Sequence, residues 1–153
     1  MPGNASTLQT VTSLTPKEAA SRLIRASKSD QDWLDRFSRQ LDQQRGGQSL
    51  ARVLQVWGLS QSEAAQLFGV SRQALSKWLQ QGIPAERSAA VADLAAATDI
   101  LVHHLKRDRI PAVVRRAAPA LDDQSMIELV ALEHTDTLLA SCRAMFDFSR
   151  AHA

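Results

Sequence analysis

The sequence predicts an all-α fold in which a helix-turn-helix unit is followed by a small helical C-terminal domain. Apolar residues recur three and four positions apart over most of the chain, and no stretch alternates apolar and polar residues as a half-buried strand would. Ala, Leu, Gln and Arg, which favour helix, are abundant. Hydrophobic residues make up 44% and charged residues 22% of the 153 positions, a balance that suits a folded protein.

The chain should begin with an unstructured segment and a first helix. Residues 1–15 are rich in Ser and Thr and are expected to be disordered. Thr15, Pro16 and Glu18 supply an N-cap, a first-turn proline and a capping-box acid. A helix should therefore run from there to about Ala26.

A second helix should begin near Ser29 and end at Gly46-Gly47, because glycine commonly terminates helices. One of its faces carries four apolar residues, Trp33, Leu34, Phe37 and Leu41. These two helices form an N-terminal extension over residues 16–47. Their apolar stripes are narrow, which predicts that the extension packs on the next unit or on a partner.

The next predicted unit covers residues 48–108 and contains a long helix. Apolar spacing predicts a helix from about Ser49 to Gly58. Further on, Gly82-Ile83-Pro84 interrupts the chain and starts an Ala-rich helix to about Arg107. An apolar seam on that helix suits either core packing or a dimer interface, and it consists of Val91, Leu94, Ala95, Thr98, Leu101, Val102 and Leu105.

The last unit, residues 109–153, is predicted to be a helical domain for partner binding or dimerisation. Ser125 with Glu128, and then Thr135, should cap two short helices. The final helix carries an apolar stripe that we expect to contact a second copy or a partner protein, formed by Leu138, Cys142, Met145 and Phe146.

The middle unit contains two helix starts, Ser60 and Ser71, at the spacing of a tight helix-turn-helix. Glu63 completes a capping box at the first start. Gly69 can adopt the left-handed conformation that turns the chain, and Ala65 is small where the second helix must approach closely. Five residues are expected to face inward and hold the helices together: Ala64, Phe68, Val70, Leu75 and Trp78.

The outer face of the second short helix has no acidic residue, and it presents Arg72, Gln73, Ser76 and Lys77. In a DNA major groove Arg suits guanine and Gln suits adenine, so Arg72 and Gln73 are expected to contact bases. Lys77 should reach a base or a phosphate, while Gln61 and Ser71 lie at helix starts that can meet phosphates. The predicted ligand is a double-stranded DNA operator bound by a homodimer.

Two stretches resemble known families. The stretch from Gly58 to Gly82, especially Gly69-Val70-Ser71-Arg72 and Ser76-Lys77-Trp78, resembles the DNA-binding unit of Xre and Cro/C1-type repressors. Residues 118–130 with the following helix resemble the toxin-binding domain of Xre/MbcA/ParS-type antitoxins, although Met126 stands where a Pro commonly follows the Ser. The second resemblance implies a RES-type toxin as partner, an NAD-consuming enzyme whose active site the antitoxin's C-terminal helices block.

Several other classes of protein are disfavoured. The single Cys142 cannot form an internal disulfide, and His103-His104 do not share a helix face, so no metal or cofactor is expected. No paired carboxylates or nucleophile-base pair indicate an enzyme. The chain has neither a secretory signal nor a stretch of membrane-spanning length, which predicts a cytoplasmic, nucleoid-associated protein with no membrane contact.

Two functional hypotheses follow. In the first, the protein is a transcriptional repressor of the antitoxin type, whose middle domain reads an operator and whose C-terminal domain binds a toxin. In the second, it is a free-standing transcription factor or a DNA-binding architectural protein, and its C-terminal domain only dimerises. A toxin encoded by a neighbouring gene would favour the first.

Overall fold

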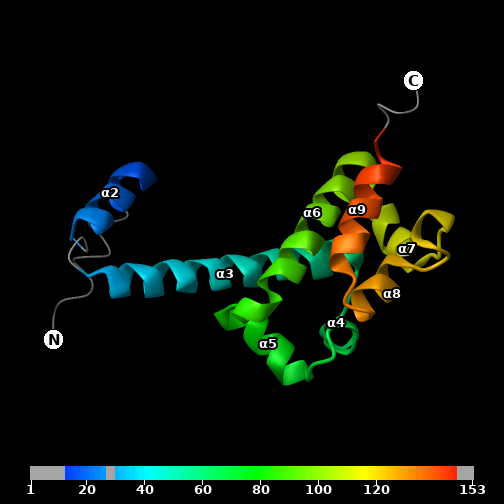
Figure 1. The fold of residues 1–153 in the computed structure, drawn as a ribbon, viewed down its shortest axis with the longest axis horizontal. Coiled ribbons are helices and arrows are strands. Elements are labelled where there is room, and N and C mark those ends of the chain that lie inside the picture. The colour runs from blue at the N-terminus through cyan, green and yellow to red at the C-terminus, as the bar shows by residue number, and fades with distance from the viewer. Residues whose placement is uncertain (1–12, 27–29, 148–153) are drawn as a thin grey trace. The chain divides into compact units, whose positions relative to one another are not determined.

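The computed structural model describes residues 13–26 and 30–147, and these residues form an all-α fold, as predicted (Figure 1). Within them there is no strand, and Ala118 and Gln124 form an isolated antiparallel bridge. The α-helices are α2 (Pro16–Ala26), α3 (Gln31–Trp57), α4 (Gln61–Leu67), α5 (Arg72–Gln81), α6 (Ser88–His104), α7 (Ile110–Arg115), α8 (Met126–Ala131) and α9 (Thr135–Met145). Short 3-10 helices are η1 (Ala85–Arg87), η2 (Arg107–Arg109) and η3 (Pro119–Leu121).

The chain divides into two compact units, one up to Leu41 and one from Asp42 onward. In the first unit, the amide of Thr15 donates to the Glu18 carboxylate at 2.9 Å and the Glu18 amide donates to the Thr15 hydroxyl, so the predicted capping of α2 is confirmed. No residue of α2 is buried. The predicted disorder of residues 1–15 falls almost entirely outside the described residues.

Helix α3 continues without interruption through Gly46-Gly47, so the predicted break at these glycines is wrong. The reason is a close approach between parts of the chain that are distant in sequence. A Cβ on Gly47 would lie 2.7 Å from the carbonyl oxygen of Trp78, and a Cβ on Gly82 would lie 2.8 Å from that of Gln43. The amide of Ile83 donates to the Gln43 carbonyl at 3.1 Å across the same contact. Gly47 therefore allows α3 to lie close to the end of α5, and it does not end the helix.

Replacing Gly47 with alanine should destabilise the protein despite alanine's higher helix propensity. The added methyl meets a backbone carbonyl, which cannot move as a flexible side chain can, so we expect a cost of about 1–3 kcal/mol from overpacking against a gain of about 1 kcal/mol in propensity. Thermal unfolding followed by circular dichroism measures the balance. Gln48→Ala, at an exposed neighbouring position of α3, is the control, and a variant at Gly47 as stable as the parent would contradict the expectation.

The core of the second unit is built around α6, which packs most extensively on α9 (Figure 1). Trp57, at the end of α3, donates from its indole nitrogen to the Thr98 hydroxyl at 2.9 Å, and that hydroxyl donates to the Leu94 carbonyl at 2.7 Å. Both polar groups are thus satisfied in a buried setting. The seam predicted on the long helix lies mostly in this core, since Val91, Leu94, Thr98 and Leu101 are buried within one chain.

The two C-terminal helices start in different ways. At α8 the predicted capping box is confirmed, with the Ser125 amide donating to Glu128 at 2.6 Å and the Glu128 amide donating to the Ser125 hydroxyl. At α9 the prediction that Thr135 is the N-cap is wrong, because the helix begins at Thr135 itself and the cap position is His134. The Thr135 hydroxyl donates instead to Asp93 of α6, at 3.1 Å. A buried hydroxyl needs a partner, and α6 provides it.

Candidate nucleic-acid interface

Helices α4 and α5 begin at the two serines that the sequence indicated. At Ser60 the amide donates to Glu63 at 2.8 Å and the Glu63 amide donates back to the Ser60 hydroxyl, which is a complete capping box. The hydroxyl of Ser71 accepts from the amide of Ala74 at 3.0 Å. Both predicted helix starts are therefore confirmed.

A tight turn sets the angle between α4 and α5. Gly69 has a φ of 62°, in the left-handed region, and nothing lies within 4 Å of where its Cβ would be, so only the backbone conformation calls for glycine. Ala65 and Leu75 are buried where the helices meet. Phe68 packs edge-on against Trp78 with ring centroids 6.0 Å apart. The predicted inward-facing set is buried, apart from the half-buried Val70.

The residues predicted to contact DNA lie on the outer side of this pair. Arg72, Gln73 and Lys77 are exposed, and Ser76 between them is half-buried. By the helical period they share one side of α5, and α5 contains no acidic residue. Gln61 and Ser71 are also exposed, each at the start of its helix. The result is a cationic and amide-bearing surface on a helix whose opposite side is anchored by Leu75 and Trp78.

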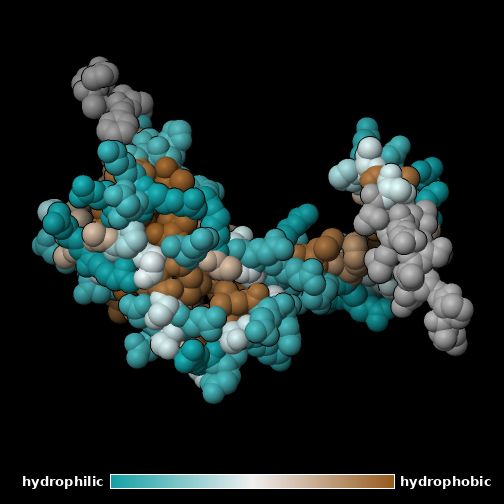
Figure 2. All heavy atoms as spheres, turned by 180° about the vertical axis from the view of Figure 1, so that it is seen from behind, coloured by the Kyte–Doolittle hydropathy of each residue, from teal (hydrophilic) through white to brown (hydrophobic). Residues whose placement is uncertain are grey.

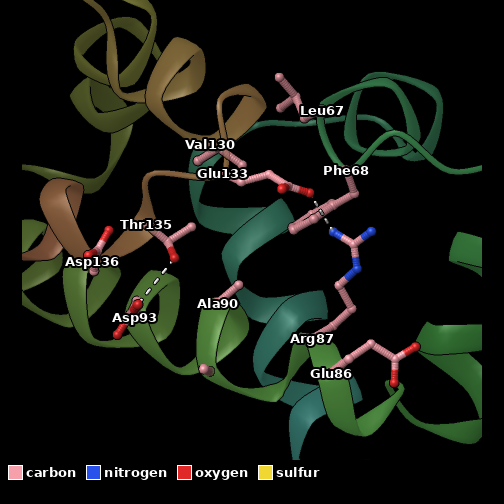
Figure 3. A pocket seen from close by; sticks show the side chains of 11 residues that line it. Leu67, Phe68, Glu86, Arg87, Ala90, Asp93, Val130, Glu133, Thr135 and Asp136 are labelled. Atoms are coloured by element: carbon pink, nitrogen blue, oxygen red, sulfur yellow. Dashed lines mark hydrogen bonds and ion pairs between the residues drawn. The ribbon is translucent and has the colours of Figure 1, made fainter.

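Arg87 contacts the inner side of α5 at Trp78. Its guanidinium lies 5.8 Å from the centre of the Trp78 ring and 3.4 Å from the carboxylate of Glu133, in the loop between α8 and α9. Figure 3 shows this pair at the edge of an open pocket of about 540 Å³. Asp93, on α6, and Asp136, on α9, also line the pocket. Sequence patterns do not reveal the ion pair of Arg87 with Glu133, because the two residues lie 46 positions apart in the chain.

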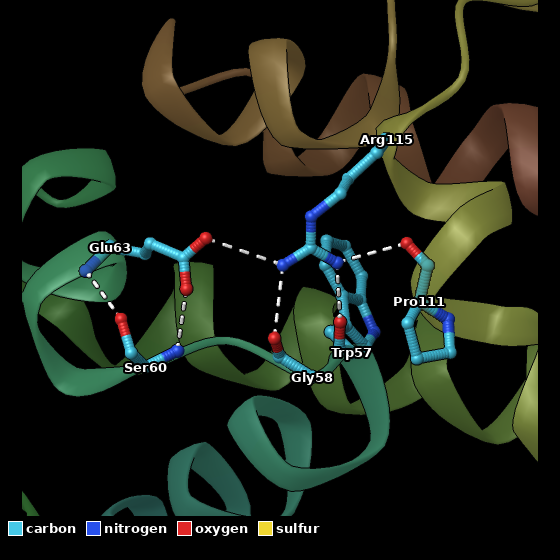
Figure 4. A network of polar contacts seen from close by, with 6 residues as sticks. All are labelled: Trp57, Gly58, Ser60, Glu63, Pro111 and Arg115. Carbon is cyan, nitrogen blue, oxygen red and sulfur yellow. Dashed lines mark hydrogen bonds and ion pairs between the residues drawn. The ribbon is translucent and has the colours of Figure 1, made fainter.

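Arg115 of α7 joins the C-terminal part of the chain to the start of α4 (Figure 4). Its guanidinium donates to the carbonyl oxygens of Trp57, Gly58 and Pro111, each at 2.9 Å, and lies 3.4 Å from the Glu63 carboxylate. The carbonyls at the end of α3 have no partner within their own helix, so a planar group with several donors suits them. Sequence reasoning left the role of this arginine open.

Glu63 is held in its charged form by the same arrangement. Hydrogen bonds from the Ser60 amide and the Ser60 hydroxyl lower the pKa of its carboxyl below the ordinary value of 4.5, and Arg115 adds to the effect. Since the charged form is favoured in the folded state, this contribution to stability is present at neutral pH and is lost as the pH falls through the lowered pKa.

Replacing Arg115 with alanine should lower the free energy of unfolding by about 1–3 kcal/mol, because the carbonyls at the end of α3 lose their donors. Lysine should restore little, since one ammonium cannot reach all the acceptors. Denaturant unfolding measures both variants. The neighbouring Arg116→Ala removes the same charge from an exposed side chain and is the matched control; equal losses in the two alanine variants would argue against the network.

The predicted partner stripe on α9 is only partly at the surface. Leu138 and Cys142 are fully buried inside the single chain, which corrects the expectation that they contact another protein. Burial also raises the pKa of the Cys142 thiol to about 11. Met145 and Phe146 are half-buried, and the Phe146 ring stacks on His104 with centroids 4.7 Å apart. The apolar spacing identified the correct face of α9, but α6 covers most of it.

A second, more apolar pocket of about 420 Å³ lies beside Met145. Val113, Leu121 and Met126 line it together with two exposed arginines, Arg109 and Arg116. Among the residues that the structure describes, no group of His, Cys, Asp or Glu is arranged to hold a metal ion. Nor is any described helix both long enough and apolar enough to cross a membrane.

The fold thus defines a class: an all-α protein in which two capped short helices, joined by a tight turn, are anchored on a longer helical core. A similar fold occurs in a chain of the crystal structure of the M. tuberculosis MbcT-MbcA toxin-antitoxin complex, with a TM-score of 0.53 and 20% sequence identity. The match covers 65% of this chain and 91% of that one. No protein-family model matches the sequence, and no curated protein does.

Proposed function

We propose that this protein binds double-stranded DNA in a sequence-specific manner, with α4 and α5 acting as a helix-turn-helix. The observation that carries the proposal is the acid-free outer side of α5, where Arg72, Gln73 and Lys77 are exposed on a helix held by a buried inner side. A major groove admits one helix and is read by side chains of these types. The resemblance of this stretch to Xre and Cro/C1-type units supports the same function.

The residues divide into two roles in this proposal. Arg72 and Gln73, in the first turn of α5, contact base edges, and Arg72 pairs with a guanine through two hydrogen bonds. Lys77, one turn further on, with Gln61, Ser71 and Ser76, contacts phosphates and fixes the position of α5 in the groove. A protein of this kind binds as a homodimer on two half-sites and would be cytoplasmic and associated with the nucleoid.

We further propose that the protein is a repressor of the antitoxin type and also binds a toxin. Two observations support this: the fold resembles a chain of a toxin-antitoxin complex, and residues 118–130 resemble a toxin-binding domain. A RES-type toxin is the partner that the resemblance implies. The pocket with Arg109 and Arg116 at its edge offers an apolar surface of suitable size for a segment of such a partner.

The alternative is a free-standing DNA-binding protein whose C-terminal part only dimerises. The burial of Leu138 and Cys142 removes half of the α9 stripe from contact with a second copy and with a partner protein alike, so it does not favour either function. Co-purification of the full chain with the product of the neighbouring gene distinguishes the two. A stable complex that dissociates on Arg109→Glu with Arg116→Glu supports the toxin-binding proposal, and an unbound chain in the presence of that product contradicts it.

DNA binding is tested by selecting duplexes from a random pool and then measuring affinity for the selected site as a function of salt. Affinity should fall steeply with salt, and Lys77→Ala should reduce the slope of log affinity against log salt by about 1 without changing the preferred sequence. Lys106→Ala, which removes the same charge from an exposed position outside α5, is the control. Failure to enrich any sequence would contradict the proposal.

A further inference from the structure

We propose that the N-terminal half of α3 pairs with the same segment of a second copy of this chain, in the antiparallel direction. One side of the helix carries an acidic residue, three apolar residues and a basic residue at spacings of four, three, four and four: Asp30, Leu34, Phe37, Leu41 and Arg45. We call this side the arm face. The inference is independent of DNA binding and concerns how two copies assemble.

Among the residues that the structure describes, most of the arm face is not covered: Leu34 is half-buried and its other four residues are exposed. Phe37 and Leu41 are 36% and 37% exposed, and no residue of α3 before Gly47 is buried. The Trp33 ring stacks on Phe37 with centroids 5.0 Å apart, which orders one edge of the face. Figure 2 shows apolar atoms on the slender segment that corresponds to this half of α3. Because a helix in water gains most of its stability from packing, an ordered face of this kind implies a partner.

The two charges at the ends of the arm face identify the partner and its direction. In a parallel pair Asp30 would lie beside Asp30 and Arg45 beside Arg45, and like charges at these positions repel. In an antiparallel pair Asp30 faces Arg45 of the second copy at both ends, and Leu34 faces Leu41 of the second copy. The two Phe37 rings then meet near the two-fold axis. The same sequence of side chains is thus complementary to itself in one direction only.

The extent of the contact sets its expected strength. From Asp30 to Arg45 the helix makes about four turns, so two such helices bury much less area than a standard protein interface. We therefore expect a dimer that dissociates on the order of micromolar concentrations. Such a dimer brings together the two copies that a pair of DNA half-sites needs, without requiring the buried stripe on α9.

Sedimentation equilibrium of the full chain over a range of concentrations, without DNA, tests the inference. Asp30→Arg alone and Arg45→Asp alone each place like charges at both ends and should weaken dimerisation about 10-fold. The two substitutions together restore opposite charges and should restore the dimer. Asp32→Arg and Arg39→Asp, which change the same charges on the other side of α3, are matched controls and should leave dimerisation unchanged.

Asp30 also caps α3, because its carboxylate accepts a hydrogen bond from the Trp33 amide at 2.9 Å. Asp30→Arg therefore removes a helix cap as well as a charge at the dimer contact. Loss of the cap would not be repaired by Arg45→Asp, so restoration by the double variant identifies the charge pair. Phe37→Glu gives a second test that leaves the cap intact, and it should abolish dimerisation while the thermal unfolding of the second unit stays the same.

Disulfide trapping reports the direction. A mixture of Leu34→Cys and Leu41→Cys chains should form cross-linked heterodimers, whereas Leu41→Cys chains alone should not cross-link. Cross-linking of Leu41→Cys with itself would indicate a parallel pair and would overturn the proposal. A parent chain that is monomeric at high micromolar concentration, or a double charge variant that stays monomeric, would also overturn it. None of these outcomes bears on whether α5 binds DNA.

Discussion

Replacing Leu138 with alanine should lower the free energy of unfolding by about 2–5 kcal/mol, because a fully buried leucine leaves a cavity between α9 and α6. Chemical denaturation followed by circular dichroism gives the value. The loss should be the same at low and high protein concentration, as expected for a side chain inside one chain.

Leu132→Ala is the matched control for this prediction. It makes the same chemical change at a leucine that is 50% exposed, and we expect a change within about 0.5 kcal/mol. If Leu138→Ala instead left unfolding unchanged and dissociated a dimer, the stripe on α9 would be an interface between chains after all.

The second large effect concerns recognition. Removing both Arg72 and Gln73 should weaken binding to the selected DNA site by about 2–6 kcal/mol, since each base contact contributes about 1–3 kcal/mol of discrimination. The affinity for unrelated DNA should fall only by the small amount expected from losing one positive charge. Gel-shift titration on the selected duplex and on a scrambled duplex, at one salt concentration, measures both affinities.

Arg143→Ala with Gln48→Ala removes the same types of side chain from exposed positions outside α4 and α5 and is the control. Because Arg72 and Gln73 are exposed, the variant should unfold at the parent's temperature. Equal affinity of parent and variant for the selected site would show that the recognition surface lies elsewhere.

Local signals in the sequence predicted the fold well wherever the deciding contact lies within one turn of helix. Ser60, Ser71 and Ser125 each accept a hydrogen bond from an amide three residues further on, and that geometry can be inferred from the residue types alone. The same holds for the exposed side of α5, since its apolar residues fix which side faces inward.

The incorrect predictions share one cause, which is a partner far away in the chain. Threonine is a residue type that commonly caps helices, but the Thr135 hydroxyl donates to Asp93, which lies 42 positions earlier. The glycines of α3 suggested a helix end, but Gly46 lies against the Ile83 side chain and Gly47 against the backbone of Trp78 and Gly82 at the end of α5. Periodicity placed Leu138 and Cys142 on an apolar face without revealing that α6 covers that face.

The network around Arg115 has a consequence for synthesis of the protein. The carbonyls of Trp57 and Gly58 and the guanidinium that binds them are separated by 58 and 57 positions in the chain. A ribosome therefore completes α4 and α5 well before it adds the residue that fixes their junction with α3. The nascent segment of α4 and α5 gains its full rigidity only when the following half of the protein has emerged, so a prematurely terminated chain would expose α4 and α5 in a loosened form open to proteolysis.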